Sequence, residues 1–174
     1  MTVSVNYEFR NELIQKNFSL TNCYQCSTCS SGCPIAFLTE GKYNPRIIIE
    51  EALLGLKDQL INENDFTIFL CSTCHKCVEL CPQGTELVEI FNTIKNYSAS
   101  RGILPKAFKI QAKNIINEGV AIPLSSAIQR RREKMGIPNP VFADPKEIQI
   151  IIKTTGLDKI LNIVLEDSNK EKVE

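Results

Sequence analysis

The chain has 174 residues and a mass of 19.6 kDa, with 43% apolar and 23% charged residues, so it can bury a core and is not a disordered protein. Twenty basic and twenty acidic residues give a formal charge of zero, which argues against a dedicated nucleic-acid binder. His75 is the only histidine, so a histidine-rich metal site is excluded, whereas eight cysteines are present.

Charge is distributed unevenly along the chain. Residues 1–90 carry 6 basic and 11 acidic side chains, residues 91–135 carry 9 and 2, and residues 136–174 carry 5 and 7. This asymmetry favours a charged docking face over a uniformly solvated surface. The N-terminus does not resemble a signal peptide, and no stretch approaches the roughly 20 apolar residues of a membrane span. We therefore expect a cytoplasmic protein without direct membrane contact, whose cysteines are thiols.

The first half of the chain predicts two helices and two cysteine-rich loops. Residues 8–17 predict an N-terminal helix. Asn44-Pro45 is typical of a helix start, and apolar residues follow it at helical spacing: Ile49, Leu53 and Leu56. Residues 65–70 alternate in polarity and fit either a strand or a helix, so this segment stays open.

Five further helices are predicted after the second cysteine-rich loop. Thr85 is a candidate N-cap for the first of them, which carries apolar residues on one face. Prolines and glycines then delimit the others. The predicted ranges are 85–102, 105–119, 123–135, 144–156 and 157–165. The polar tail from Glu166 is expected to fray.

The eight cysteines form two copies of one motif, C-x2-C-x2-C-x3-C-P, offset by 48 residues. The copies read CYQCSTCSSGCP at 23–34 and CSTCHKCVELCP at 71–82, and no cysteine is left over. Three thiolates spaced two residues apart can bind three corners of a cubane cluster from one tight loop. The fourth precedes a proline that turns the chain away, toward a neighbouring cluster. The motif therefore indicates two [4Fe-4S] clusters.

The fourth cysteine of each motif binds the other cluster in two-cluster ferredoxins. The predicted ligands are Cys23, Cys26, Cys29 and Cys81 for cluster one, and Cys71, Cys74, Cys77 and Cys33 for cluster two. With four thiolates each, both clusters are one-electron centres without an open position for substrate. A zinc site generally uses two separated ligand pairs, and disulfides are rare in the cytosol, so both alternatives fit the motif less well.

The helices and motifs together predict an all-α fold. We expect an N-terminal helical lead at 1–19, an α-helical ferredoxin domain with two [4Fe-4S] clusters at 20–102, and a C-terminal helical extension and tail at 103–174. No glycine-rich nucleotide or flavin motif is present, so the chain has no signature for a second cofactor.

Two groups of charged residues can be interpreted either as ordinary solvent-exposed side chains or as functional residues. His75 and Lys76 lie between the two cluster ligands Cys74 and Cys77. They are either an exposed pair in the loop or residues that tune the potential of the cluster. The basic run is either a solvated helix end or a docking surface for an acidic partner. Its residues are Arg130, Arg131, Arg132 and Lys134.

Three segments resemble the C subunit of the heterodisulfide reductase of methanogenic archaea. These are CYQCSTCSSGCP, FLCSTCHKCVELCPQGTEL and, in the extension, the basic segment IQRRREKMGIP, and the similarity extends over roughly residues 18–155. The resemblance implies a relay protein without catalytic residues of its own. In that family it passes electrons through two [4Fe-4S] clusters from the flavin-bearing A subunit to the B subunit, which reduces the CoB–CoM heterodisulfide in methanogenesis. A hydrogenase or formate dehydrogenase feeds the complex.

Other functions remain open. The cysteine motifs are shared with iron–sulfur subunits of succinate, glycerol-3-phosphate and glycolate dehydrogenases, so a relay in another anaerobic dehydrogenase is the alternative. A structural metal-binding module is supported only by the basic segment 91–135. An enzyme acting alone is disfavoured, because the clusters use every cysteine.

Overall fold

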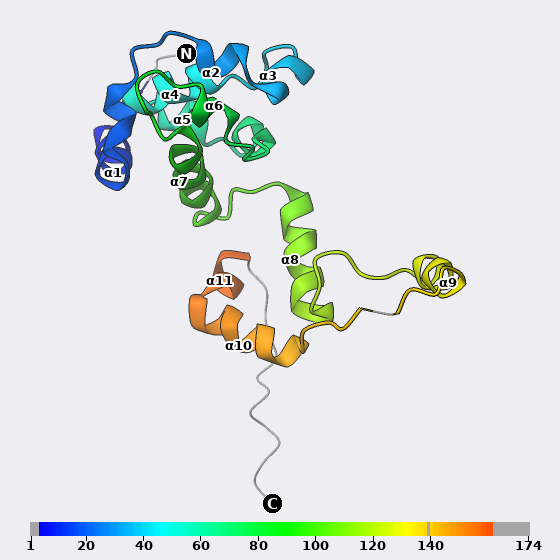
Figure 1. Cartoon of the computed structure of the whole chain (residues 1–174). Helices are drawn as coiled ribbons and strands as arrows, with labels where there is room; N and C mark the ends of the chain where they lie inside the picture. The colour runs from blue at the N-terminus through cyan, green and yellow to red at the C-terminus, as the bar shows by residue number, and fades with distance from the viewer. Residues whose placement is uncertain (1–3, 139, 162–174) are drawn as a thin grey trace, which may run out of the picture. The chain divides into compact units, whose positions relative to one another are not determined.

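The computed structural model describes residues 4–138 and 140–161, and these residues form helices joined by loops (Figure 1). No strand occurs in these ranges, so the predicted all-α class is confirmed. The chain divides into two compact units, Met1–Leu104 and Pro105–Glu174.

Unit 1 holds both cysteine motifs. Its elements are α1 (Tyr7–Lys16), the 3-10 helix η1 (Phe18–Asn22), α2 (Thr28–Ser31), α3 (Pro34–Leu38), α4 (Pro45–Leu54), α5 (Lys57–Leu60), the 3-10 helix η2 (Thr67–Leu70), α6 (Lys76–Glu79) and α7 (Leu87–Ala99). The core lies where α1, α4 and α7 pack together, and its side chains include Leu13, Ile49, Phe91 and Ile94. Burying such a side chain contributes about 1.5–3 kcal/mol. The N-terminal helix is thus part of the unit that carries the cysteines.

A backbone contact joins the start of α1 to the end of α4. The amide of Asn6 donates to the carbonyl oxygen of Gly55 at 2.8 Å. Gly55 is the C-cap of α4, with φ of +70°, and a Cβ there would lie 2.7 Å from the carbonyl oxygen of Asn6. Only glycine meets both demands, the left-handed backbone and the close approach.

Unit 2 contains α8 (Lys106–Glu118), α9 (Ser126–Lys134), α10 (Pro145–Thr155) and α11 (Leu157–Leu161). Helices α8 and α10 pack together and bury Ile116 and Ile152. The Gln149 side chain on α10 donates to the carbonyl oxygen of Ile116 at 3.2 Å. Because α9 has no buried residue, it does not contribute to the core of this unit.

Four predicted helix boundaries are confirmed by their caps. The side chains of Asn44 and Asp144 accept hydrogen bonds from backbone amides in the first turns of α4 and α10. Gly119 and Gly156 end α8 and α10 in the left-handed conformation, with φ of +72° and +73°.

The predicted N-cap at Thr85 is wrong. Helix α7 begins at Leu87, and Glu86 is its N-cap residue. Thr85 is buried, and its amide donates to the sulfur of Cys81 at 3.3 Å, so the cysteine motif determines its position. Tertiary contacts here override the local capping preference.

The open segment 65–70 contains the 3-10 helix η2 and no strand, so the helical alternative is confirmed. The Asp65 carboxylate accepts a hydrogen bond from the amide of Thr67 at 2.8 Å, which bends the chain into η2. One isolated backbone bridge pairs Asp65 with Asn62.

The remaining predictions concern unit 2. The helix expected at 123–135 begins later, at Ser126, because the Ser125 hydroxyl caps it by accepting from the amide of Ile128 at 3.3 Å. The helix expected at 157–165 is described only to Leu161; its last residues and the tail from 166 lie outside the described residues. None of the helices in the described ranges combines the length and apolar character needed to cross a bilayer.

Candidate iron–sulfur site

Two cavities in unit 1 are each lined by four cysteines. Cavity one is lined by Cys23, Cys26, Cys29 and Cys81, and cavity two by Cys33, Cys71, Cys74 and Cys77. Each cavity therefore combines three cysteines of one motif with the last cysteine of the other. The motifs are interlocked, and neither can complete its cavity alone.

The backbone of the two motifs repeats as closely as the sequence does. Gln25 and Ser27 have φ of +65° and +68°, and the residues 48 positions later, Thr73 and His75, have +52° and +61°. Left-handed backbone is strained for residues other than glycine, and such strain concentrates at functional sites. Here it bends each loop between successive cysteines, so that three sulfurs face one cavity.

The burial of the cysteines also repeats. Cys29 and Cys77, the third cysteines, are each 8% exposed and lie on the short helices α2 and α6, which pack against each other. Cys26 and Cys74, the second cysteines, are exposed. Each cavity thus has a buried side toward the other motif and an open side toward solvent.

Hydrogen bonds reach the sulfurs of the first and last cysteine of each motif. The donors are the backbone amides of Ala36 to Cys33 at 3.5 Å, Thr73 to Cys71 at 3.4 Å and Thr85 to Cys81 at 3.3 Å, and the side-chain amide of Gln25 to Cys23 at 3.5 Å. Hydrogen bonds to the ligand sulfurs are among the features that set the potential of an iron–sulfur cluster.

The pKa values of the cysteines differ with their surroundings. The Thr28 hydroxyl, 3.3 Å from the sulfur of Cys26, lowers the pKa of that exposed thiol. Burial raises the pKa of Cys29, and burial followed by the charge of Cys71 raises the pKa of Cys77 to about 12. A bound iron ion supplies the positive charge that a buried thiolate needs.

The arrangement of the cysteine sulfurs fits an iron–sulfur cluster better than a single metal ion. In the described residues, no three His, Cys, Asp or Glu side chains gather closely enough to hold a single metal ion. Ligands of a cubane each bind a different iron atom, so they stand further apart than ligands of one ion. The first turns of α4 and α7 also border both cavities, and the positive ends of their dipoles suit an anionic cluster.

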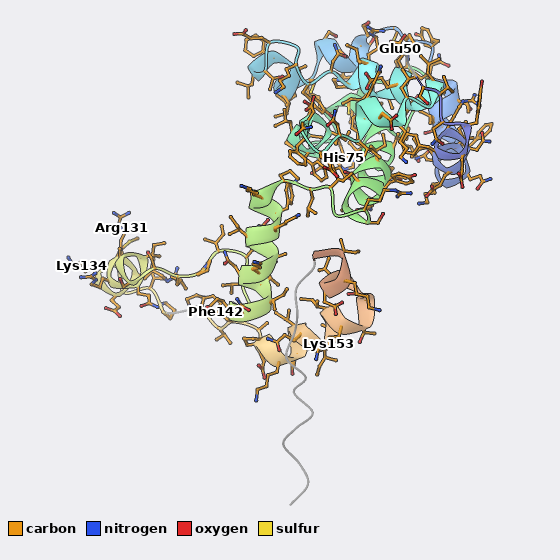
Figure 2. The ribbon with its side chains drawn as sticks, turned by 180° about the vertical axis from the view of Figure 1, so that it is seen from behind. Glu50, His75, Arg131, Lys134, Phe142 and Lys153 are labelled. Carbon is orange, nitrogen blue, oxygen red and sulfur yellow. The ribbon has the colours of Figure 1, made fainter. Side chains whose placement is uncertain are left out.

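The two residues that were predicted to tune a cluster, His75 and Lys76, both line cavity two. His75 and Lys76 are exposed, and His75 is the N-cap residue of α6 (Figure 2). The first motif, residues 23–34, contains no charged residue, yet Arg46 of α4 lines cavity one. Its guanidinium donates to Gln25 at 3.1 Å and to Glu50 at 2.9 Å. No spacing rule links Arg46 to the cysteines; helix packing brings it there.

Sequence analysis missed three further residues around the cavities. Tyr43 lines cavity two and Thr85 lines cavity one. Lys95 of α7 donates to the carbonyl oxygen of Cys71 at 3.2 Å. The periodicity of α7 could have placed Lys95 on the polar side of that helix, but nothing in the sequence links Tyr43 to a cluster.

The predicted basic run lies on α9, in unit 2. Arg131 and Lys134 are exposed and project from the helix (Figure 2). Arg130 donates to the carbonyl oxygen of Ser126 at 3.3 Å, and Arg132 to that of Pro138 at 2.6 Å. Within the described part of the chain, none of the four basic side chains of the run forms an ion pair.

The chain is similar in sequence to known iron–sulfur proteins. The sequence model of the 4Fe-4S dicluster domain family matches residues 19–85, which include both motifs. The chain is 34% identical over 149 residues to the C subunit of the H2:CoB-CoM heterodisulfide, ferredoxin reductase of Methanothermobacter marburgensis, covering 82% of this chain and 78% of that protein. It is 32% identical over 172 residues to the iron-sulfur C 2 subunit of the CoB–CoM heterodisulfide reductase of Methanocaldococcus jannaschii, covering 90% of each.

Proposed function

Because the chain belongs to the family of heterodisulfide reductase C subunits, we propose that it is the electron-transfer subunit of a CoB–CoM heterodisulfide reductase complex. It relays electrons through two [4Fe-4S] clusters, from the flavin-bearing A subunit to the catalytic B subunit. The observation that carries the proposal is the pair of interlocked cavities, each lined by four cysteines. Each cluster, when bound, accepts and releases one electron.

The ligand assignment follows the two cavities. Cluster one is held by Cys23, Cys26, Cys29 and Cys81, and cluster two by Cys33, Cys71, Cys74 and Cys77. The four sulfur-directed hydrogen bonds and the first turns of α4 and α7 support this assignment. Lys76 and Arg46 place positive charge beside the clusters, and these two residues together with the His75 side chain tune the cluster potentials.

The route of the electron follows from burial. Cys26 and Cys74 are exposed, so each cluster presents one edge at the protein surface. Cys29 and Cys77 are buried and lie on the packed helices α2 and α6, and the charge of Cys29 adds to the raised pKa of Cys77. We assign the surface edges to entry and exit of the electron, and the side where α2 packs against α6 to transfer between the clusters.

Disulfide reduction itself is catalysed by a partner subunit. Cleaving a disulfide needs two electrons and two protons, whereas each cluster carries one electron. All eight cysteines are used as ligands, so neither cluster offers an open iron.

The partners are therefore the A and B subunits of heterodisulfide reductase, and the basic residues of α9 are the docking surface for one of them. A hydrogenase or formate dehydrogenase supplies the electrons indirectly; this is supported by the names of two relatives, which include H2 in one case and H2 or formate in the other.

The test begins with anaerobic purification of the full chain. We expect a brown protein with about eight iron and eight sulfide ions, the content of two [4Fe-4S] clusters, and two signals by electron paramagnetic resonance after reduction. A colourless protein that binds zinc would contradict the proposal and support a structural metal module.

The second step separates a relay from an enzyme. The reduced protein, mixed with the CoB–CoM disulfide, should hold its electrons until the catalytic partner is added, when thiols form. Steady thiol formation by the chain alone would rule out a purely relaying role. Efficient discharge to a succinate, glycerol-3-phosphate or glycolate dehydrogenase, but not to the catalytic partner, would favour the alternative relay.

A further inference from the structure

Two residues that line the cavities carry buried hydroxyl groups without a well-formed hydrogen bond. The Tyr43 hydroxyl and the Thr85 Oγ1 make no hydrogen bond of good geometry, although each residue is only 1% exposed. Within the described residues of unit 1, these are the two buried side-chain polar atoms without one. Buried hydroxyls are almost always hydrogen-bonded, because leaving one unpaired costs free energy.

The two residues occupy equivalent places in the duplicated fold. Tyr43 directly precedes the N-cap residue of α4, the long helix after the first motif, and Thr85 directly precedes that of α7, the long helix after the second. Each lines the same cavity as the last cysteine of its own motif, Cys33 for Tyr43 and Cys81 for Thr85. Each cavity is therefore lined by one of these two hydroxyl-bearing residues.

The neighbours of Tyr43 are cysteines of cavity two. Burial raises the pKa of Tyr43 above its ordinary value, and so do hydrogen bonding to Cys71 and the charges of Cys71, Cys33 and Cys77. The Tyr43 hydroxyl therefore lies near the sulfur of Cys71, without the geometry of a well-formed hydrogen bond to it. Phe91 packs edge-to-face against the ring at a centroid distance of 6.3 Å and holds its orientation.

Thr85 is held beside cavity one by its backbone. Its amide donates to the sulfur of Cys81 at 3.3 Å, so its side chain lies next to the same cysteine. Thr85 lines this cavity together with Cys23, Cys29 and Cys81, and its Oγ1 is buried. Sulfur is therefore the acceptor that the cavity offers to this hydroxyl, as in cavity two.

We propose that Tyr43 donates an O–H···S hydrogen bond to cluster two and Thr85 donates one to cluster one, and that each bond raises the reduction potential of its own cluster. This proposal rests on the proposed function, because it requires both clusters to be bound. One-electron reduction adds a negative charge to a cluster, so a donor to its sulfur stabilises the reduced state more than the oxidised state.

The experiment uses Tyr43→Phe and Thr85→Val, which remove the hydroxyls and keep the shapes of the side chains. Potentials are measured in the anaerobically purified full chain by a redox titration followed by electron paramagnetic resonance. We expect the equilibrium constant for reduction of the affected cluster to fall roughly tenfold. For a one-electron couple this corresponds to a reduction potential that is lower by about 59 mV. Tyr43→Phe should lower only the potential of cluster two, and Thr85→Val only that of cluster one.

Matched controls distinguish the hydroxyl from general perturbation. Tyr97→Phe and Thr93→Val remove hydroxyls that line neither cavity and should leave both potentials unchanged. Thr85→Ser keeps the hydroxyl and should retain the wild-type potential, which tests the same chemistry independently of Tyr43.

Three outcomes would overturn the proposal. Wild-type potentials in Tyr43→Phe and Thr85→Val would refute the hydroxyl bonds while leaving the relay function intact, as would equal shifts of both clusters in each variant. A Thr85→Ser potential equal to that of Thr85→Val would refute the role of the Thr85 hydroxyl. A wild-type protein without iron–sulfur clusters would overturn the proposed function and this inference together.

Discussion

Gly32 and Leu80, which hold the same position in the two copies of the motif, lie against each other. A Cβ on Gly32 would collide with the Cδ1 of Leu80. The first copy therefore needs a residue without a side chain at this position, and the second copy fills the space that it leaves. The duplicated motifs fit together through this difference, next to the cysteines that follow, Cys33 and Cys81.

We predict that Gly32→Ala destabilises the contact between the motifs. Overpacking of this kind costs about 1–3 kcal/mol, and we expect the low end because Leu80 is 40% exposed and its side chain can move. The measurement is the apparent melting temperature of the cluster-loaded protein, with the rate of cluster loss to a chelator as a second readout.

Leu80→Ala provides the matched control for this prediction. In the Gly32→Ala background it should restore part of the lost stability, because the added methyl group then has room. Strictly additive effects of the two substitutions would show that the contact between Gly32 and Leu80 does not limit packing.

A second prediction concerns the interlocked cavities. Cys33→Ser should damage the cluster held by Cys71, Cys74 and Cys77, although Cys33 belongs to the first motif, because Cys33 lines cavity two. Electron paramagnetic resonance of the reduced variant identifies the signal that changes. Cys81→Ser is the reciprocal variant and should affect the other signal. If Cys33→Ser instead abolishes the signal of the cluster in its own motif, the crossed ligand assignment is wrong.

The third prediction concerns the exposed cations of α9. Reversing the charge of Arg131 and Lys134 with Glu should slow assembly with partner subunits, most strongly at low salt, and leave both clusters loaded. These two residues are preferable to Arg132, whose guanidinium also holds the carbonyl oxygen of Pro138. The association rate is measured at several ionic strengths.

The charge-matched control for α9 replaces Lys146 and Lys159 with Glu. Both are exposed lysines of unit 2 outside the basic run. If this control slows assembly as much as the α9 variant does, net charge and not a docking surface explains the effect. Unchanged association rates for the α9 variant at every salt concentration would support a merely solvated helix.

The fourth prediction is a pH dependence at Glu51. Burial raises the pKa of its carboxyl above the ordinary value, and the charges of Glu50 and Asp65 add to this effect. A raised folded-state pKa means that the ionised form destabilises the folded protein above that pKa, and that the penalty disappears as the pH falls below the ordinary value. Glu51→Gln should therefore raise the melting temperature at pH 8, with a gain that shrinks as the pH is lowered.

Glu63→Gln is the control, because Glu63 is an exposed glutamate of the same unit that does not contribute to the raised pKa of Glu51. Melting temperatures of the two cluster-loaded variants are compared with the wild type over the same pH series. A pH-independent effect of Glu51→Gln would show that the Glu51 carboxyl is not unfavourably ionised in the folded protein.

Local sequence signals predicted helix ends well where the cap is self-contained. Asn44 and Asp144 cap α4 and α10 with their own side chains, and Gly156 ends α10 through its own backbone. Thr85 carries an equally good local signal and was mispredicted, because its amide donates to the sulfur of Cys81 and its hydroxyl is buried. A capping residue follows its local preference only when no tertiary partner competes for it.

The sequence by itself determined the chemistry of this protein. Eight cysteines at a repeated short spacing specify sulfur ligands for clusters, since the covalent chain alone brings three thiolates of one loop to one side. Only the tertiary structure decided what surrounds those thiolates. Arg46, Tyr43 and Thr85 reach the cavities through the packing of α4 and α7, and no spacing along the chain encodes such long-range contacts.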